Sequence, residues 1–187
     1  MPDPVFWVPN GYVVIGADCR ATNECEGDHF AHFDSQISRD FNDLVEWAAQ
    51  QSWCDGNIGG NGVSYLAATQ WLGASEKPPH LKAIIPWEGF TDFYREHVTH
   101  GGIPDTNFFR EIWGRRMNSE TGFIAKGATT EDIVAEQKQR PLMDDFWRSK
   151  HPDLKKIDTA VFAVASWATA GLHTRGSIEG FKQASSE

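Results

Sequence analysis

The chain has 187 residues, and its 17 basic and 26 acidic side chains give a formal net charge of −9 at pH 7. An acidic protein repels the phosphates of nucleic acids, so we expect no nucleic-acid partner. Hydrophobic residues make up 40% and aromatic residues 12% of the chain, which is more apolar surface than a disordered protein carries. The composition therefore predicts a folded protein with a buried core.

The sequence shows no sign of membrane insertion or secretion. It contains no run of about 18 apolar residues, and its first residues lack the basic flank and apolar stretch of a secretion signal. The chain has three cysteines, Cys19, Cys25 and Cys54. This odd number and their spacing do not fit a disulfide framework or a zinc site. We therefore expect a cytoplasmic protein with reduced thiols and no membrane partner.

Short apolar segments alternate with helical patterns in the first half of the chain. Residues 11–17 form an apolar, β-branched run that is typical of a buried strand. Apolar side chains at helical spacing follow over residues 35–51 and, after a glycine-rich segment, over residues 65–72. Residues 81–86 form a further strand-like run. This alternation predicts an α/β fold with a mainly parallel, doubly wound sheet.

The second half of the chain changes character twice. Residues 92–158 are irregular, charged and rich in aromatic side chains, and we expect them to form an inserted helical cap. Residues 160–166 return to the pattern of a buried strand, and residues 177–183 begin a last helix. The predicted division is therefore a core over residues 1–91, a cap over residues 92–158 and a return to the core over residues 159–187.

Ser64 lies in the segment Gly62-Val63-Ser64-Tyr65, where a short strand is expected to turn sharply into a helix. This context is typical of a nucleophile elbow, in which a serine hydroxyl projects above the end of a sheet. Small neighbours allow the tight turn; here Leu66 stands where a second glycine is usual, and Ala67 follows it. A helix N-terminus stabilises anions, so the Tyr65 N–H would contribute to an oxyanion hole. The alternative is that Ser64 only caps the helix.

A further pattern extends over nearly the whole chain. Its most specific part runs from Trp53-Cys54-Asp55-Gly56 into the segment around Ser64. Its other parts are Gly11-Tyr12-Val13-Val14, Asp18-x-Arg20, Glu26-Gly27, Leu81–Pro86, Asp92-Phe93-Tyr94 and Ser166-Trp167. These stretches resemble the CocE/NonD family of serine hydrolases, which includes cocaine esterase and is related to the X-Pro dipeptidyl-peptidases. The resemblance implies an α/β-hydrolase fold with a helical cap, a small-molecule ester or amide substrate, and an acyl-enzyme on Ser64.

The chain departs from the pattern of that family in three places. The acid of the family's triad follows the strand after the cap, and the corresponding turn here, Trp167–Gly171, holds no carboxylate. The catalytic histidine of the family follows a further strand, and a tyrosine of its oxyanion hole precedes the matching region. We therefore expect a sheet that is incomplete at both ends and weak or no activity from this chain alone.

Three functions fit these patterns. The first is a serine hydrolase with Ser64 as nucleophile. In this hypothesis His173 would act as a substitute base, and Glu88 or Asp92 would orient it. A histidine in a loop more commonly forms a hydrogen bond to the backbone, however. The second is a non-catalytic, hydrolase-like module that binds an apolar ligand or a partner chain. Unpaired strand edges would favour its association into a homo-oligomer. The third reuses the elbow for a non-hydrolytic step such as lyase or cyclase chemistry.

Two histidine pairs resemble metal-ligand patterns. They are His29-x-x-His32 and Glu96-His97-x-x-His100. Neither has the HExxH arrangement of zinc enzymes or an evident further ligand. The sequence also lacks a phosphate loop and a dinucleotide fingerprint. We therefore expect these histidines to lie in solvated loops or on helix surfaces, and we expect neither a metal nor a cofactor.

Overall fold

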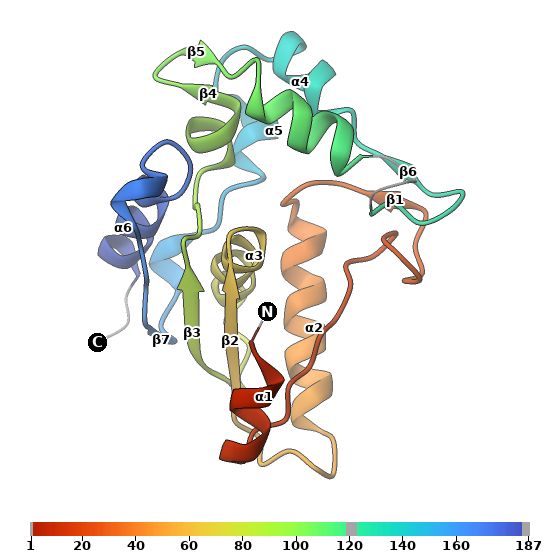
Figure 1. Ribbon diagram of the computed structural model, residues 1–187, viewed down its shortest axis with the longest axis vertical. Coiled ribbons are helices and arrows are strands. Elements are labelled where there is room, and N and C mark those ends of the chain that lie inside the picture. The colour runs from red at the N-terminus through yellow and green to blue at the C-terminus, as the bar shows by residue number, and fades with distance from the viewer. Residues whose placement is uncertain (1, 119–122, 185–187) are drawn as a thin grey trace. The chain divides into compact units, whose positions relative to one another are not determined.

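The computed structural model describes residues 2–118 and 123–184 of the chain (Figure 1). These residues form two compact units. The first unit comprises Met1–Ala17, Ser35–Thr91 and Pro152–Glu187, and the second comprises Asp18–Asp34 and Asp92–His151. The division into domains at residues 1–91, 92–158 and 159–187 stays a prediction from the sequence.

A parallel sheet forms the centre of the first unit. Its strands follow the order β2 (Ile58–Val63), β3 (Leu81–Trp87) and β7 (Ala160–Val161). After a register shift at its start, β2 pairs with β3 up to the pair of Val63 and Trp87. Because neighbouring strands are parallel, their carboxyl ends meet at the same edge of the sheet, where α/β folds place their ligands. The predicted α/β fold with a mainly parallel sheet is confirmed.

Two helices connect and cover these strands. The predicted helices are both present, as α2 (Ser35–Ala49) and α3 (Tyr65–Ser75). The α3 helix lies behind β2 and β3 in Figure 1 and is buried over most of its length, because its side chains are apolar on nearly every face. The buried core of this unit consists of Val45, Trp71, Ala74, Leu81, Ile84, Leu154 and Ile157.

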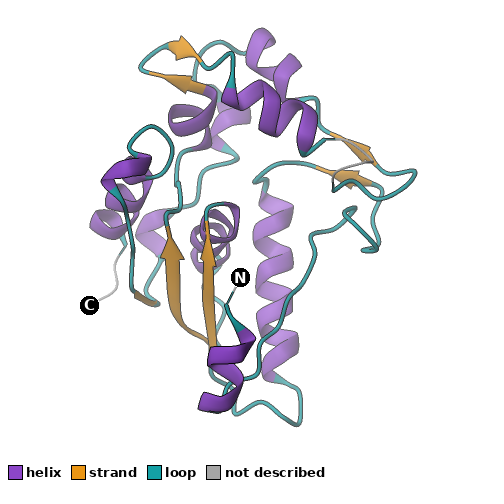
Figure 2. Cartoon of the chain, viewed as in Figure 1, coloured by secondary structure: helices purple, strands orange, loops and turns teal. Residues whose placement is uncertain are grey.

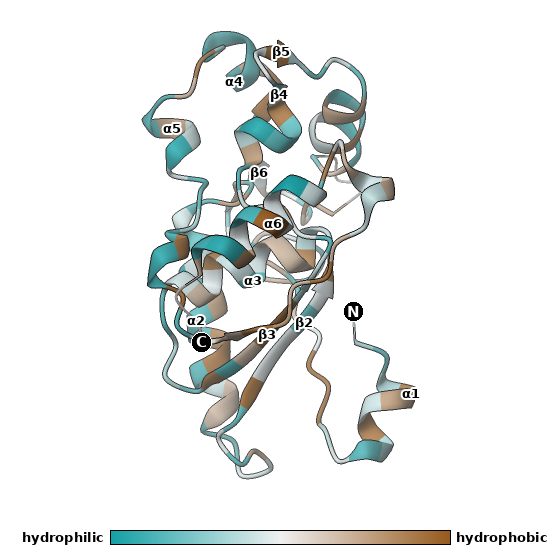
Figure 3. Ribbon diagram, turned by 90° about the vertical axis from the view of Figure 1, so that its left-hand side faces the viewer, coloured by the Kyte–Doolittle hydropathy of each residue, from teal (hydrophilic) through white to brown (hydrophobic). Residues whose placement is uncertain are grey.

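The last helix of the first unit, α6 (Thr174–Gln183), packs directly on this core. Figure 3 shows hydrophilic and hydrophobic bands along α6, as expected for a helix with one buried face. A Cβ atom on Gly180 would lie 2.7 Å from the Trp71 ring, so only a glycine allows this approach. The helix begins three residues before the predicted position, whereas the strand predicted over residues 160–166 is regular only over Ala160–Val161.

Residues 11–17 do not form the predicted strand. They are an irregular loop that follows the short helix α1 (Pro4–Trp7), as Figure 2 shows. Tyr12, Val13 and Ile15 are exposed. A strand needs a hydrogen-bonded neighbour, and no strand in the described part of the chain pairs with this segment. The prediction from apolar, β-branched composition was therefore wrong.

The second unit combines short helices, two-residue strands and loops around an aromatic core, so the helical character predicted for residues 92–158 is present only in part. Its regular elements are β1 (His29–Phe30), β4 (Thr99–His100), β5 (Ile103–Pro104), β6 (Thr129–Thr130), α4 (Ile133–Gln139), α5 (Asp145–Arg148) and π-helical turns at Tyr94–Val98 and Arg110–Arg116. The side chains of Phe33, Phe93, Phe109, Trp113 and Trp147 are buried. Within residues 2–118 and 123–184, no helix is both long and apolar enough to cross a lipid bilayer.

A buried polar network crosses the second unit. Lys150 Nζ lies 2.9 Å from Glu131 Oε1 and donates a hydrogen bond of 2.7 Å to the His32 carbonyl oxygen. His32 Nε2 lies 2.7 Å from the Asn118 side-chain oxygen. Burial lowers the pKa of His32 to about 4, and the Lys150 charge adds to this effect while the bond to Asn118 opposes it. The His32 ring is therefore neutral at pH 7.

The low pKa of His32 predicts that acid destabilises the fold. The unfolded chain binds a proton at this residue near pH 6.5, whereas the folded chain binds it near pH 4. The free energy of unfolding should therefore fall by about 2 kcal/mol from this group between pH 7 and pH 4.5. In urea titrations at the two pH values, we expect His32→Gln to remove this part of the pH dependence. His29→Gln, which changes an exposed histidine, should retain it, and an unchanged dependence in His32→Gln would contradict the prediction.

Candidate active site

Ser64 occupies the turn between β2 and α3 in a backbone conformation that is unusual for a serine. Its φ and ψ angles are 58° and −113°. The Ser64 N–H donates a hydrogen bond of 3.0 Å to the Trp87 carbonyl oxygen at the end of β3, and the Ser64 carbonyl oxygen accepts bonds from the first turn of α3. Such a conformation costs about 1–3 kcal/mol and persists only where neighbouring structure imposes it. The strand and the helix therefore hold Ser64 at the carboxyl edge of the sheet.

Gly62 is the residue that makes this turn sterically feasible. A Cβ atom on Gly62 would overlap the Cβ atom of Leu66, which lies two residues after the serine in the first turn of α3. The two positions touch, which explains why small residues are usual at both of them. Leu66 is tolerated here because Gly62 has no side chain.

Gln70 supports the turn from within the first unit. Its side chain is buried, its Oε1 accepts a hydrogen bond of 3.0 Å from the Ile85 N–H, and its Nε2 donates one of 2.7 Å to the Leu66 carbonyl oxygen. The side chain thus joins α3 to β3 directly behind the serine. We did not single out this residue from the sequence, although a polar side chain in a helix as apolar as α3 was a usable signal.

The Ser64 side chain does not cap α3. It forms no hydrogen bond to the amides of the helix, and its Oγ lies 3.1 Å from His173 Nε2 instead. The interpretation of Ser64 as a helix cap is therefore contradicted. The hydroxyl stands within hydrogen-bonding distance of an imidazole, the group that most often accepts a serine proton in enzymes.

His173 directly precedes α6 and is only 8% exposed. Its ring stacks on the Phe90 ring with 6.5 Å between centroids and 13° between planes. Burial lowers the pKa of His173 below its ordinary value, and the nearby Glu88 carboxylate partly opposes this effect. The ring is therefore neutral at pH 7 and able to accept a proton.

Glu88 is the carboxylate next to this histidine in the first unit. It follows β3, has a φ angle of 53°, and donates a backbone hydrogen bond of 2.7 Å to the Val164 carbonyl oxygen. Its Oε2 lies 4.0 Å from His173 Nδ1. Asp92, the other acid considered from the sequence, belongs to the second unit and pairs with Arg95 at 2.6 Å. Within the first unit, the structure thus brings Glu88 to the histidine.

The remaining sequence-predicted positions are placed as follows. Tyr65 is the first residue of α3, so its amide belongs to the N-terminal turn of the helix. Residues Trp167–Thr169 form a single turn of 3₁₀ helix, and the segment up to Gly171 holds no carboxylate. The roles proposed for Ser64 and Tyr65 stay predictions from the sequence.

The histidine pairs do not behave as expected. His32 and His97 are fully buried in the second unit rather than solvated, and Trp113 Nε1 donates a hydrogen bond of 3.2 Å to His97 Nδ1. Aromatic neighbours enclose both rings, which is why the surface interpretation was wrong for these two residues. In the described part of the chain, no three His, Cys, Asp or Glu side chains are placed to hold a metal ion.

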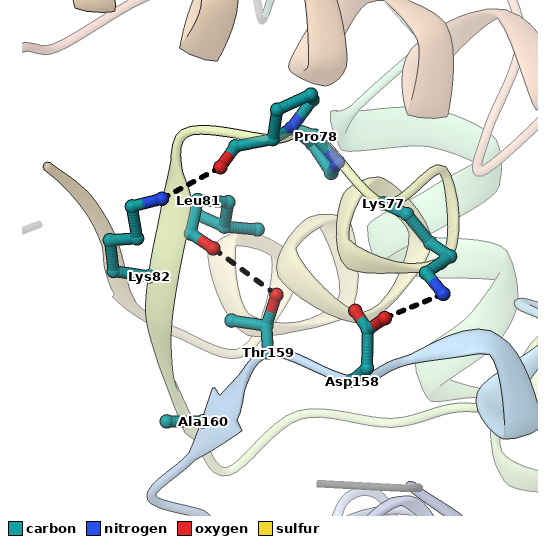
Figure 4. A pocket seen from close by; sticks show the side chains of 8 residues that line it. Lys77, Pro78, Leu81, Lys82, Asp158, Thr159 and Ala160 are labelled. Carbon is teal, nitrogen blue, oxygen red and sulfur yellow. Dashed lines mark hydrogen bonds and ion pairs between the residues drawn. The ribbon is translucent and has the colours of Figure 1, made fainter. Parts of the chain in front are cut away.

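A hollow of about 360 Å³ lies at the other end of the sheet (Figure 4). It is lined by Lys77, Pro78, Pro79, Leu81, Lys82, Asp158, Thr159 and Ala160. Lys77 and Asp158 form an ion pair, and Thr159 Oγ1 donates to the Leu81 carbonyl oxygen. Because Leu81 begins β3 whereas Ser64 follows the end of β2, the hollow is remote from the serine.

A parallel sheet, a strained serine at its carboxyl edge and a helix that begins at the next residue define an α/β-hydrolase fold. A family model described as X-Pro dipeptidyl-peptidase (S15 family) matches residues 2–187. The chain belongs to this family of hydrolases, which confirms the resemblance seen in the sequence.

Individual relatives agree with this assignment. Cocaine esterase from Rhodococcus sp. is 42% identical over 89 residues, which cover 48% of this chain and 15% of the esterase. A putative Xaa-Pro dipeptidyl-peptidase from Bacillus cereus is 25% identical over 183 residues, which cover 85% of this chain and 31% of the relative. The crystal structure of a CocE/NonD family hydrolase from Staphylococcus aureus has a TM-score of 0.93 and 49% identity, and the match covers 100% of this chain and 33% of that one. The chain thus spans a third or less of the length of these relatives.

The contact between positions 62 and 66 predicts a specific pattern of stability. We expect Gly62→Ala to lower the free energy of unfolding by about 1–3 kcal/mol, because the new Cβ atom overlaps that of Leu66. Adding Leu66→Gly should recover most of this loss, apart from about 1 kcal/mol of helix propensity. Adding Leu66→Ala instead keeps the Cβ atom and should not recover it. Urea unfolding of the single and double variants measures these values, and equal recovery by both second substitutions would disprove the explanation.

Proposed function

We propose that this chain carries the nucleophile of a serine hydrolase that cleaves ester or amide bonds of small molecules through an acyl-enzyme on Ser64. The observation that carries the proposal is the strained turn at Ser64, whose φ angle of 58° places the hydroxyl beside an imidazole nitrogen. Strained residues cluster at active sites because the strain fixes a reactive group in position. A serine with a purely structural role has no need of this conformation.

The reaction would proceed in two acyl transfers. Ser64 Oγ bonds to the acyl carbon as its proton passes to a base and the carbonyl π-electron pair moves onto the carbonyl oxygen. The tetrahedral intermediate then expels the alcohol or amine, which takes the proton from the base. Water repeats both steps and releases the acid. The Tyr65 N–H would help to stabilise the oxyanion, because it lies in the first turn of α3.

The names of the relatives support an acyl substrate. One is an esterase for cocaine, and another is a putative Xaa-Pro dipeptidyl-peptidase. Ester and peptide cleavage both transfer an acyl group to water and use the same nucleophile. We therefore propose a small or medium acyl ester or amide as substrate. A homo-oligomer and a cytoplasmic location stay predictions from the sequence.

The alternative of a non-catalytic binding module has less support. It rests on the lack of a carboxylate in Trp167–Gly171. The distance of 3.1 Å between Ser64 Oγ and His173 Nε2 favours the hydrolase, because a binding module gains nothing from a neutral imidazole beside the hydroxyl.

A fluorophosphonate probe tests the nucleophile, since it reacts only with an activated serine. We expect the chain to be labelled on the peptide that contains Ser64, as read by mass spectrometry. Ser64→Ala should abolish labelling, whereas Ser75→Ala, at the other end of α3, should leave it unchanged. Absence of labelling in a sample whose circular dichroism shows a folded chain would refute the proposed function, and so would labelling at a different serine.

A further inference from the structure

We propose that the first unit contains its own proton-transfer pair, in which His173 is the base for Ser64 and Glu88 is the positioning residue that orients the His173 ring. This inference rests on the proposed function, because it assigns the group that takes the Ser64 proton. Ser64 follows β2, Glu88 follows β3 and His173 precedes α6. Three separate elements of one unit therefore bring these residues together.

His173 meets the requirements of a general base. Its Nε2 lies 3.1 Å from Ser64 Oγ, within reach of the hydroxyl proton. Its ring is neutral at pH 7, because burial outweighs the attraction of Glu88 and lowers its pKa. As Ser64 Oγ bonds to the acyl carbon, the proton moves to His173 Nε2. The same proton then moves to the departing alcohol or amine, so His173 ends neutral.

Glu88 faces the opposite nitrogen of the ring. Its Oε2 lies 4.0 Å from His173 Nδ1, which is longer than a hydrogen bond. Catalytic contacts are often long in unliganded enzymes and shorten when substrate binds. A carboxylate on this side favours the tautomer whose Nδ1 carries the hydrogen, which leaves Nε2 free of a proton and directed at the serine.

The position of Glu88 follows from the topology of the sheet. β3 lies between β2 and β7, and all three strands are parallel. Their carboxyl ends therefore meet at one edge, so a carboxylate after β3 reaches the same space as one after β7. The turn after β7 holds no carboxylate at Trp167–Gly171, whereas the residue directly after β3 is Glu88.

The main chain around this carboxylate is firmly held. Glu88 has a φ angle of 53°, a conformation that costs about 1–3 kcal/mol in a residue other than glycine. Ser177 Oγ in α6 donates a hydrogen bond of 2.9 Å to the Gly89 carbonyl oxygen, and Thr91 Oγ1 donates one of 3.3 Å to the Gly176 carbonyl oxygen. These bonds join the segment after β3 to the helix that begins beside His173, and so fix the distance between carboxylate and ring.

The groups around the His173 ring come from each element packed against it. They include the Ser64 hydroxyl, the Phe90 ring and the Glu88 carboxylate. The charge of Glu88 raises the pKa of His173 against the effect of burial. Removing this charge should therefore lower the pKa of His173 further.

The rate of phosphonylation by a fluorophosphonate probe, measured from pH 4 to pH 9, tests both assignments in the 187-residue chain. We expect His173→Gln to slow labelling about 100-fold or more at pH 7.5. Glu88→Gln should slow the plateau rate about tenfold or more and move the acid limb of the profile to lower pH. Glu179→Gln is the matched control, because it makes the same change of charge on α6, where Glu179 contacts Gln183. It should change neither the plateau rate nor the position of the acid limb.

The outcomes separate this inference from the proposed function. If Ser64→Ala abolishes labelling while His173→Gln labels at the parent rate, the serine is the nucleophile and the assignment of His173 is wrong. If Glu88→Gln behaves like Glu179→Gln in rate and in acid limb, the assignment of Glu88 is wrong. NMR titration of the His173 ring does not depend on activity: its pKa should lie below 6.5 in the parent chain and fall in Glu88→Gln. An unchanged pKa in Glu88→Gln would overturn the positioning role.

Discussion

The backbone conformation of Ser64 is the constraint on which the rest of the site depends. It is imposed from two sides, since the Ser64 amide bonds to Trp87 in β3 and the Ser64 carbonyl oxygen accepts the first bonds of α3. The cost of the left-handed conformation is offset by the pairing of β2 with β3 and by the burial of α3. Gly62 is the steric condition for all of this, because any side chain there would displace the first turn of the helix.

The two units contain buried histidines in opposite electrostatic surroundings. Burial lowers the pKa of both His32 and His173. The Lys150 ammonium next to His32 lowers it further, so that ring stays neutral far into the acid range. The Glu88 carboxylate next to His173 opposes the effect of burial and so limits the lowering of the His173 pKa. His32 is the more buried of the two rings, with 0% against 8% of its surface exposed, and the opposite signs of the neighbouring charges widen the difference between a structural histidine in one unit and a candidate base in the other.

The site is held together by side chains that have no chemical role of their own. Gln70 joins α3 to β3 behind the serine, while Ser177 and Thr91 join α6 to the segment that carries Glu88. Each of these groups satisfies a backbone partner that would otherwise be buried at a cost. The same bonds that complete the packing of the first unit therefore set the distances between Ser64, His173 and Glu88.

The local elements and the turn between two of them could be predicted without the structure. Periodicity placed α2, α3 and β3 nearly correctly, and glycine next to serine indicated the sharp bend at Ser64, because these features depend on neighbours within a few residues. The same reasoning failed for residues 11–17, since a strand exists only if another strand pairs with it.

Which side chains meet depends on how the distant segments of the chain pack together. His173 is 109 positions from Ser64, and the spacing of the sequence left Glu88 and Asp92 equally eligible as its acid. Only the parallel order of β2, β3 and β7 and the packing of α6 against Trp71 bring Glu88 to the histidine. His32 and His97 became core residues for the same reason, because burial is a property of the assembled unit that local spacing does not encode.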